Sequence, residues 1–351
     1  MTTVPRSGAA TVDQDGAIHV PAHELPLSQA LSPESRELMA RALSMAPPTA
    51  IPRASDFADE DSFRAMVDMF RKGVDERYAT PRAQSLLEVM PVAVRATTIG
   101  GIPIEEFTPH EGAHKDAVLI NLHGGGFFSG AIHVGRIESV PLAYLGGYRV
   151  ISVDYRQGYE HKFPAATEDV VAAYTALLED YAPERIGIYG GSAGGVLTAQ
   201  ATAWFIDKGL PVPGAIGIFG AGTGGSGDSN YFAAIGTGLA PPMAAMSNLA
   251  DGSVGYFADA FDDDYLVNPI LAPEHFRAHF PPALFITGTR SFDLSPAIAT
   301  HRALVQAGVD ASLHVFDGLA HCFYYDAHTP EGADAYQTIL RFFAKHLRPE
   351  Q

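Results

Sequence analysis

The 351-residue chain has a single cysteine, Cys322, so it can form no internal disulfide bond. This usage suits a reducing compartment, and we expect a cytoplasmic location. The chain also lacks a run of about 20 apolar residues, which a membrane-spanning helix requires. Residues 1–28 are polar and interrupted by proline, without the apolar core of a signal peptide. We therefore expect no secretion signal and no membrane partner.

Basic residues are also few. The chain has 23 Lys and Arg against 40 Asp and Glu, a formal net charge of −17. Nucleic acids and anionic membranes are bound by clustered positive charge, so neither is an expected partner. Hydrophobic residues make up 47% of the chain and charged residues only 18%, a composition typical of a globular protein with a large core.

From residue 92 onward, apolar runs alternate with helical patterns. The helical patterns cover residues 138–144, 165–181, 193–208, 295–307 and 333–346. The apolar runs cover residues 92–99, 102–107, 117–122, 149–154, 186–189, 215–219, 283–287 and 312–316. This alternation predicts an α/β fold in which helices cover a mostly parallel, eight-stranded sheet.

The first 90 residues do not follow this alternation. An arm of about 30 residues, read as irregular, precedes a helix that begins near Ser32, and a second helix follows Ser55 or Asp56. Residues 221–268 break the later pattern with a segment rich in glycine and serine. We expect residues 1–90 and this insertion to form a helical cap on a main domain of residues 91–351.

One motif connects an apolar run directly to a helical pattern: Gly190–Gly194, with the sequence Gly-Gly-Ser-Ala-Gly. Gly-x-Ser-x-Gly between a strand and a helix predicts a nucleophile elbow, a strained turn that presents the serine hydroxyl. Ser192 is then the nucleophile, at a helix N-terminus whose N–H groups favour negative charge. By itself the pattern is also compatible with an ordinary glycine-rich turn.

A second motif, His123–Gly126, follows the apolar run 117–122. Consecutive glycines expose backbone N–H groups, which a developing oxyanion requires. A flexible connecting loop is the alternative, but the Gly-x-Ser-x-Gly motif two strands later favours the esterase arrangement of the two motifs. Phe127 and Phe128 come next and are predicted to bind substrate. The N–H groups predicted to form the oxyanion hole are those of Gly124, Gly125 and Ala193.

The predicted last strand, residues 312–316, leads into the loop Asp317–Phe323. A loop at the carboxyl end of a strand is where a parallel sheet presents catalytic groups. His321 in this loop is the predicted general base, and Cys322 is interpreted as a small apolar neighbour. The other histidines do not have the spacing of metal ligands, so no metal site is expected.

Together these motifs resemble the hormone-sensitive-lipase-like branch of the α/β-hydrolase fold, the bacterial family IV carboxylesterases. The resemblance implies a Ser–His–acid triad that cleaves a small-molecule ester of short to medium acyl length through an acyl-enzyme, without a cofactor. This chain departs from the branch at Gly191, where an acid is frequent, and at Cys322, where glycine is usual. The matching segments are His123–Gly126, Asp154–Arg156 with Phe163–Ala166, Gly190–Gly195, Asn268-Pro269 through Pro281–Leu284, and Gly318–Phe323.

Two alternatives to ester hydrolysis stay open. The same triad can serve an amide or carbamate hydrolase, which only an assay distinguishes. A ligand-binding protein on the hydrolase scaffold is the other alternative, and such a protein has no need of an intact Ser192–His321 pair.

The triad acid is where the chain differs most from the branch. Members place an aspartate three residues beyond the glycine that follows the strand of residues 283–287, and here Ser291 occupies that position. Asp293 lies two residues later, at most ~7 Å along an extended chain, and is the predicted acid. The alternatives are that Asp293 only caps the next helix, with Ser291 or a water completing the triad, or that Asp317 is the acid.

The last predicted strand also suggests an oligomer. An exposed edge strand tends to pair with a partner or to be covered. We therefore expect a homodimer through Ser312–Phe316.

Overall fold

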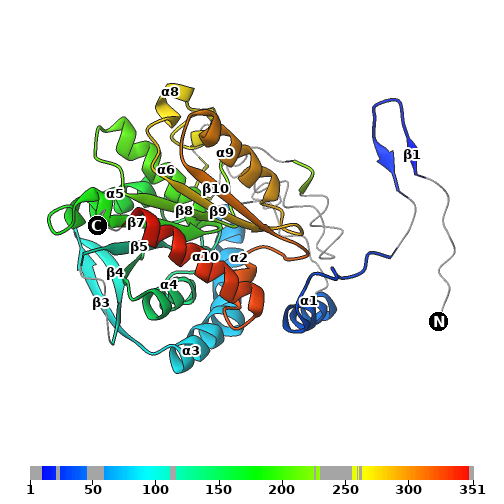
Figure 1. Ribbon diagram of the computed structural model, residues 1–351, viewed down its shortest axis with the longest axis horizontal. Helices are drawn as coiled ribbons and strands as arrows, with labels where there is room; N and C mark the ends of the chain where they lie inside the picture. The colour runs from blue at the N-terminus through cyan, green and yellow to red at the C-terminus, as the bar shows by residue number, and fades with distance from the viewer. Residues whose placement is uncertain are drawn as a thin grey trace.

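The computed structural model describes residues 10–20, 24–45, 59–110, 116–224, 227–229, 255–258, 260 and 263–347. A central sheet with helices packed around it forms the body (Figure 1). Most of the insertion predicted at 221–268 lies outside the described residues, so its part in a cap stays a prediction.

The eight predicted strands are all present, in the order β10-β9-β8-β7-β5-β6-β4-β3. The β3–β4 and β4–β6 pairs are antiparallel, and the other pairs are parallel. This confirms the mostly parallel sheet. The strands are β3 (Val92–Ile99), β4 (Ile102–Pro109), β5 (Val118–Leu122), β6 (Arg149–Val153), β7 (Ile186–Gly191), β8 (Ala215–Phe219), β9 (Ala283–Gly288) and β10 (Ala311–Phe316).

Both faces of the sheet are covered because its central strands are apolar on both sides. In β5, Ile120 packs in one hydrophobic cluster and its neighbour Leu119 in another, as successive strand residues point to opposite faces. All five predicted helices are present. The helices are α4 (His133–Gly146), α5 (Ala165–Leu177), α6 (Ala193–Asp207), α9 (Leu294–Gln306) and α10 (Pro330–His346). Shorter helical pieces are η3 (Pro183–Arg185), η5 (Pro269–Leu271), α8 (Glu274–Arg277) and η6 (Phe323–Tyr325).

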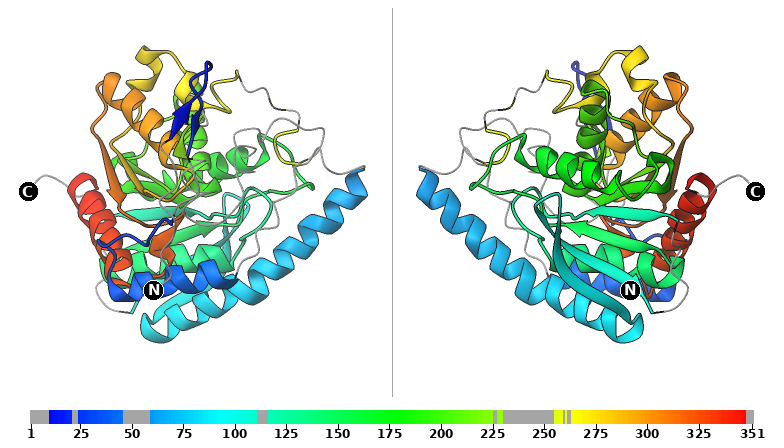
Figure 2. Two further views of the ribbon diagram at one scale, coloured as in Figure 1. Left: turned by 90° about the vertical axis from the view of Figure 1, so that its right-hand side faces the viewer. Right: turned by 90° about the vertical axis from the view of Figure 1, so that its left-hand side faces the viewer.

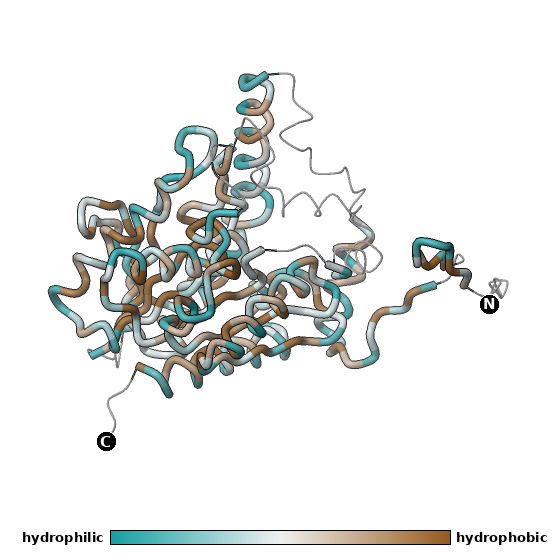
Figure 3. Tube along the Cα trace, turned by 90° about the horizontal axis from the view of Figure 1, so that it is seen from above, coloured by the Kyte–Doolittle hydropathy of each residue, from teal (hydrophilic) through white to brown (hydrophobic). Residues whose placement is uncertain are grey.

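The N-terminal region differs in part from the prediction. A small antiparallel hairpin, β1 (Thr11–Val12) and β2 (Ile18–His19), lies in the arm that was predicted to be irregular. It stands away from the body of the protein (Figures 1 and 3). Strands of two residues are too short to show an apolar alternation that the sequence pattern could detect.

In the described residues from 24 to 90, three α-helices follow the arm rather than two. They are α1 (Pro33–Met45), α2 (Glu60–Val74) and α3 (Thr80–Val89), and a π-helical turn, η2 (Asp75–Ala79), joins the last two into one long stretch (Figure 2). Ser32 and Ser35 at the start of α1 donate hydrogen bonds to Glu331 of α10. Leu86 of α3 packs in the core cluster of the main domain. A part of residues 1–90 therefore belongs to the main core.

The sheet has two open edges, β3 and β10. Val315 of β10 is 42% exposed. The homodimer through Ser312–Phe316 stays a prediction. Among the helices that the structure describes, none is both long enough and apolar enough to cross a membrane.

Candidate active site

The predicted motifs meet at the carboxyl ends of the parallel strands. Strands β5 and β7 are neighbours, and Leu122 at the end of β5 pairs with Gly190 near the end of β7. The triple-glycine loop after β5 therefore lies beside the serine turn after β7. The loops after β9 and β10, which carry the predicted acid and base, leave the same edge of the sheet.

Ser192 has the strained backbone of a nucleophile elbow, with φ 55° and ψ −122°. Glycines surround it because the chain is crowded there. A Cβ on Gly194 would lie 1.7 Å from the carbonyl oxygen of Leu122, and one on Gly190 would lie 2.2 Å from the same atom. The N–H of Ser192 donates to the carbonyl of Phe219, at 2.8 Å. Close packing and this hydrogen bond thus hold the turn in its strained conformation, as strain at a functional residue requires.

Ser192, His321 and Asp293 form a continuous hydrogen-bonded chain. His321 Nε2 lies 2.9 Å from Ser192 Oγ, and its Nδ1 lies 2.8 Å from Asp293 Oδ1. Asp293 is only 3% exposed, and its carboxylate also accepts hydrogen bonds from the hydroxyls of Thr287 and Ser291. The imidazole is therefore held between a hydroxyl and a carboxylate, which is the geometry of a general base.

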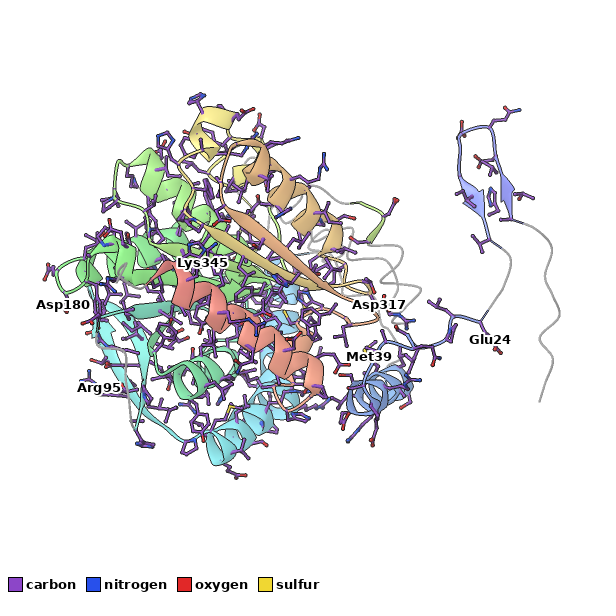
Figure 4. All side chains as sticks on the ribbon, in the orientation of Figure 1. Glu24, Met39, Arg95, Asp180, Asp317 and Lys345 are labelled. Carbon is purple, nitrogen blue, oxygen red and sulfur yellow. The ribbon has the colours of Figure 1, made fainter. Side chains whose placement is uncertain are left out.

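The structure separates the three candidates for the acid. Ser291 donates its hydroxyl to Asp293 Oδ1, the oxygen that also lies against His321, and so is a hydrogen-bond partner of the acid. Asp293 makes no side-chain capping bond at the start of α9, although it occupies the N-cap position. Asp317 accepts from the hydroxyls of Ser28 and Thr289 instead, on the side where the N-terminal segment meets the body (Figure 4). Only Asp293 of the three lies against His321.

The environment of His321 raises its pKa. Burial disfavours the imidazolium and lowers the pKa, but the neighbouring Cys322 sulfur and the Asp293 carboxylate raise it by more. The Cys322 Sγ lies 3.5 Å from His321 Nε2, and Cys322 has a left-handed backbone with φ 51°. Phe292 packs against the imidazole, with ring centroids 4.3 Å apart.

The prediction that the N–H of Gly124 is an oxyanion donor is wrong. The N–H of Gly124 donates to Glu138 Oε1 at 3.1 Å, and an amide has only one hydrogen to give. Gly125 has φ 127°, and a Cβ there would lie 2.1 Å from the carbonyl oxygen of Ser129. Ala193 is the first residue of α6, where an N–H has no partner within the helix. The N–H groups of Gly125 and Ala193 are the two predicted oxyanion donors that remain.

The prediction for Phe127 also needs correction. Its side chain is 1% exposed and stacks on Tyr256, with ring centroids 5.0 Å apart, so it is a core residue without open surface for a substrate. Phe127 also has a left-handed backbone, with φ 63°. Phe128 is half-buried, and its carbonyl accepts a hydrogen bond from Arg71 of α2. Substrate contact by Phe128 stays a prediction.

Sequence reasoning missed one side chain of this site, Glu138 of α4. It is 1% exposed and lies between the glycine loop and the serine turn. The signal that points to it is a glutamate next to Ile137 and shortly before the apolar run Val140–Ala143, because an acid is buried only where it is paired or hydrogen-bonded. The described residues contain no group of three or more His, Cys, Asp or Glu that could hold a metal ion.

Comparisons with known proteins show which family and which solved structures the chain is similar to. A family model described as alpha/beta hydrolase fold matches residues 119–325. The crystal structure of esterase E25 is 29% identical, with a TM-score of 0.79, over 94% of this chain and 99% of that one. An esterase from the bacterial hormone-sensitive lipase family is 28% identical, with a TM-score of 0.71, over 91% of this chain and 100% of that one.

A curated relative matches a shorter stretch. An acetyl-hydrolase of Streptomyces hygroscopicus is 38% identical over 120 residues, which are 34% of this chain and 39% of that protein. The chain thus spans about two fifths of the length of this curated relative.

Proposed function

Because this chain belongs to the alpha/beta hydrolase fold family, we propose that it is a carboxylic ester hydrolase of the hormone-sensitive-lipase branch. The observation that carries the proposal is the hydrogen-bonded chain from Ser192 through His321 to Asp293. The similarity to solved esterases over nearly the whole chain supports it.

Acylation begins when Ser192 Oγ attacks the acyl carbon of the ester while His321 Nε2 takes the hydroxyl proton. Asp293 stabilises the imidazolium that forms. The negative charge on the carbonyl oxygen is stabilised by the N–H groups of Gly125 and Ala193, and each such donor typically contributes 10²–10³ in rate. His321 then gives its proton to the leaving alcohol, and an acyl-enzyme ester of Ser192 is formed.

Deacylation repeats these steps with water. His321 removes a proton from a water molecule, whose oxygen attacks the acyl carbon of the ester at Ser192. The second tetrahedral intermediate uses the same oxyanion donors. When it collapses, Ser192 Oγ leaves and recovers its proton from His321, and the carboxylic acid is released.

The test combines turnover of p-nitrophenyl acetate with labelling by a phosphonylating serine reagent, read by intact-mass and peptide mass spectrometry. The proposal expects ester turnover and one equivalent of label, on Ser192. Labelling without turnover of any ester would favour an amide or carbamate hydrolase. Neither labelling nor turnover would favour a ligand-binding protein on this scaffold.

Short acyl chains are expected to be the better substrates. The acetyl-hydrolase name of the Streptomyces relative and the half-buried Phe128 beside the oxyanion loop support this expectation. Measured as kcat/KM over p-nitrophenyl esters from acetate to palmitate, activity should peak at or below medium length. An optimum at palmitate would overturn the prediction.

Activity is expected to rise with pH through the raised pKa of His321. The base must be neutral to accept the Ser192 proton, so kcat/KM is lost as the imidazole is protonated below its pKa. The half-maximal pH on the acid side should therefore lie above ~6.5, the usual value for histidine.

Cys322→Gly tests the cause of this shift. Glycine tolerates the left-handed backbone at this position and removes the sulfur that raises the pKa of His321. The acid limb of the kcat/KM profile should move to lower pH in this variant. A limb that stays in place would show that Cys322 does not set the pKa of the base.

A further inference from the structure

We infer that Glu138 is a positioning residue, whose buried carboxylate ties the oxyanion loop to the nucleophile elbow. The inference rests on the proposed function, since it assigns a role in the same site. Glu138 lies on α4, the helix that follows the oxyanion loop, while the serine turn comes much later in the chain, after β7. No hydrogen bond joins Glu138 to a side chain of the triad among the described residues.

Both oxygens of the carboxylate accept hydrogen bonds. Oε1 accepts from the N–H of Gly124, at 3.1 Å, and from the hydroxyl of Tyr325. Oε2 accepts from Asn121 Nδ2, at 2.7 Å, and from the N–H of Gly191, at 3.3 Å. These donors come from strand β5, the oxyanion loop, the serine turn and the segment after His321. One side chain thus connects the three loops of the site.

The donor set explains how a carboxylate is kept there. The pKa of Glu138 is raised to about 7, because burial raises it by more than the hydrogen bonds from Tyr325, Asn121, Gly124 and Gly191 lower it. Four donors suit an ionised carboxylate, which has only acceptors. A buried charge without hydrogen-bond partners is strongly destabilising, so moving a donor away from the carboxylate would cost free energy. The carboxylate therefore keeps its four donors in fixed positions.

The consequence for catalysis follows from the position of Gly124. Its N–H is hydrogen-bonded to Glu138, which fixes the position of Gly124. The next peptide group, which carries the N–H of Gly125, is thereby held in place as well. Gly191 precedes Ser192 and is anchored to the other oxygen of the same carboxylate. Catalysis by oxyanion donors depends on their placement to within about 0.5 Å relative to the nucleophile. Glu138 sets that distance through two hydrogen bonds.

The glycine at position 191 fits this arrangement. A Cβ there would lie 2.8 Å from Glu138 Oε1 and 2.3 Å from the hydroxyl of Tyr324. The space beside the nucleophile is therefore taken by a carboxylate that enters from α4. This accounts for the departure of the chain from its branch at Gly191.

Glu138→Gln is the decisive variant. Glutamine has nearly the same shape but only one carbonyl oxygen, whereas the N–H groups of Gly124 and Gly191 need one acceptor oxygen each. In either orientation of the amide, one of the two backbone anchors is lost. Assayed at pH 8 with p-nitrophenyl acetate, kcat should fall about 100-fold, the cost of one misplaced oxyanion donor, while KM stays within about threefold.

Glu106→Gln is the matched control. Glu106 is also a buried glutamate, 8% exposed, but it pairs with Arg95 and Arg149 away from the site. Its kcat should stay near the wild-type value even where its melting temperature falls. Binding of a trifluoromethyl ketone, which forms an oxyanion at Ser192, gives a second readout. Its Ki should rise in Glu138→Gln by about the factor by which kcat/KM falls, and should not change in Glu106→Gln.

Glu138→Asp serves if the glutamine variant does not fold. Aspartate keeps the charge but draws both oxygens back by one methylene, so kcat should still fall at least tenfold. The inference is overturned if kcat is unchanged in a folded Glu138 variant, or if it falls equally in Glu106→Gln. A wild-type protein that neither reacts with the phosphonylating reagent nor turns over esters would instead contradict the proposed function.

Discussion

Ser192→Ala is expected to lower kcat/KM by about 10⁶-fold, or about 8 kcal/mol of transition-state stabilisation. Removal of the hydroxyl deletes the nucleophile, and no other hydroxyl is hydrogen-bonded to His321 Nε2 in the described part of the chain. The fold should persist, because Ser192 is a strained residue whose backbone conformation contributes no stability. The measurement is turnover of p-nitrophenyl acetate, with circular dichroism and the melting temperature to show that the fold is intact.

The same variant should also lose the phosphonyl label. Only a serine activated by a base reacts with such reagents, so the adduct at Ser192 must disappear when the hydroxyl is gone. Ser44→Ala, at an exposed serine of α1, is the control and should keep both label and activity. A label that survives in Ser192→Ala would assign the nucleophile to another residue.

Asp293→Asn is expected to lower kcat by about 10⁴-fold, or roughly 5.5 kcal/mol. The Asp293 carboxylate accepts a hydrogen bond from the N–H at His321 Nδ1, which fixes the tautomer whose Nε2 is free to take the Ser192 proton. An amide can donate to Nδ1 instead, which stabilises the tautomer that carries its proton on Nε2. The base then faces the hydroxyl with a hydrogen and cannot accept another. The measurement is kcat at the pH optimum of the wild-type protein.

Two neighbours provide the controls for this variant. Ser291→Ala removes one of the hydrogen bonds to Asp293 and leaves the acid in place, so activity should fall less than about tenfold. Asp317→Asn makes the same chemical change in the loop of His321, but its carboxylate pairs with Ser28 and Thr289 and should have little effect. If Ser291→Ala or Asp317→Asn were the damaging change, the third member of the triad would lie there.

Much of the fold follows from short-range patterns. Apolar runs such as 117–122 and 215–219 alternate with helical patterns, and this predicted all eight strands of the sheet and the five helices that follow them. The covering of both faces follows from the same runs, because a strand that is apolar at successive positions must be buried on both sides. Among the elements that the pattern did not predict, the β1–β2 hairpin lies where the apolar periodicity is weak, and α3 lies where the periodicity continues that of an earlier helix.

The nucleophile and the base could also be predicted from the sequence. The turn at Ser192 is forced by local glycines between a strand and a helix, and the glycine motif His123–Gly126 two strands earlier favours a nucleophile elbow over an ordinary turn. His321 follows from the position of its loop at the end of the last strand. Both predictions depend on residues that are close along the chain. Because each residue follows a predicted parallel strand, both were expected at the carboxyl edge of the sheet.

The remaining parts of the site were decided by tertiary structure, because they depend on contacts between distant segments. Asp293 rather than Asp317 meets His321 because Asp317 is engaged by Ser28, 289 residues away along the chain. Gly124 is not free as an oxyanion donor because a carboxylate from α4 reaches its N–H. Side-chain direction and hydrogen-bond partners of this kind are set by packing, which a periodic pattern of apolar residues does not encode. The sequence alone therefore determined which segments carry the chemistry, and the folded chain decided which of their atoms meet.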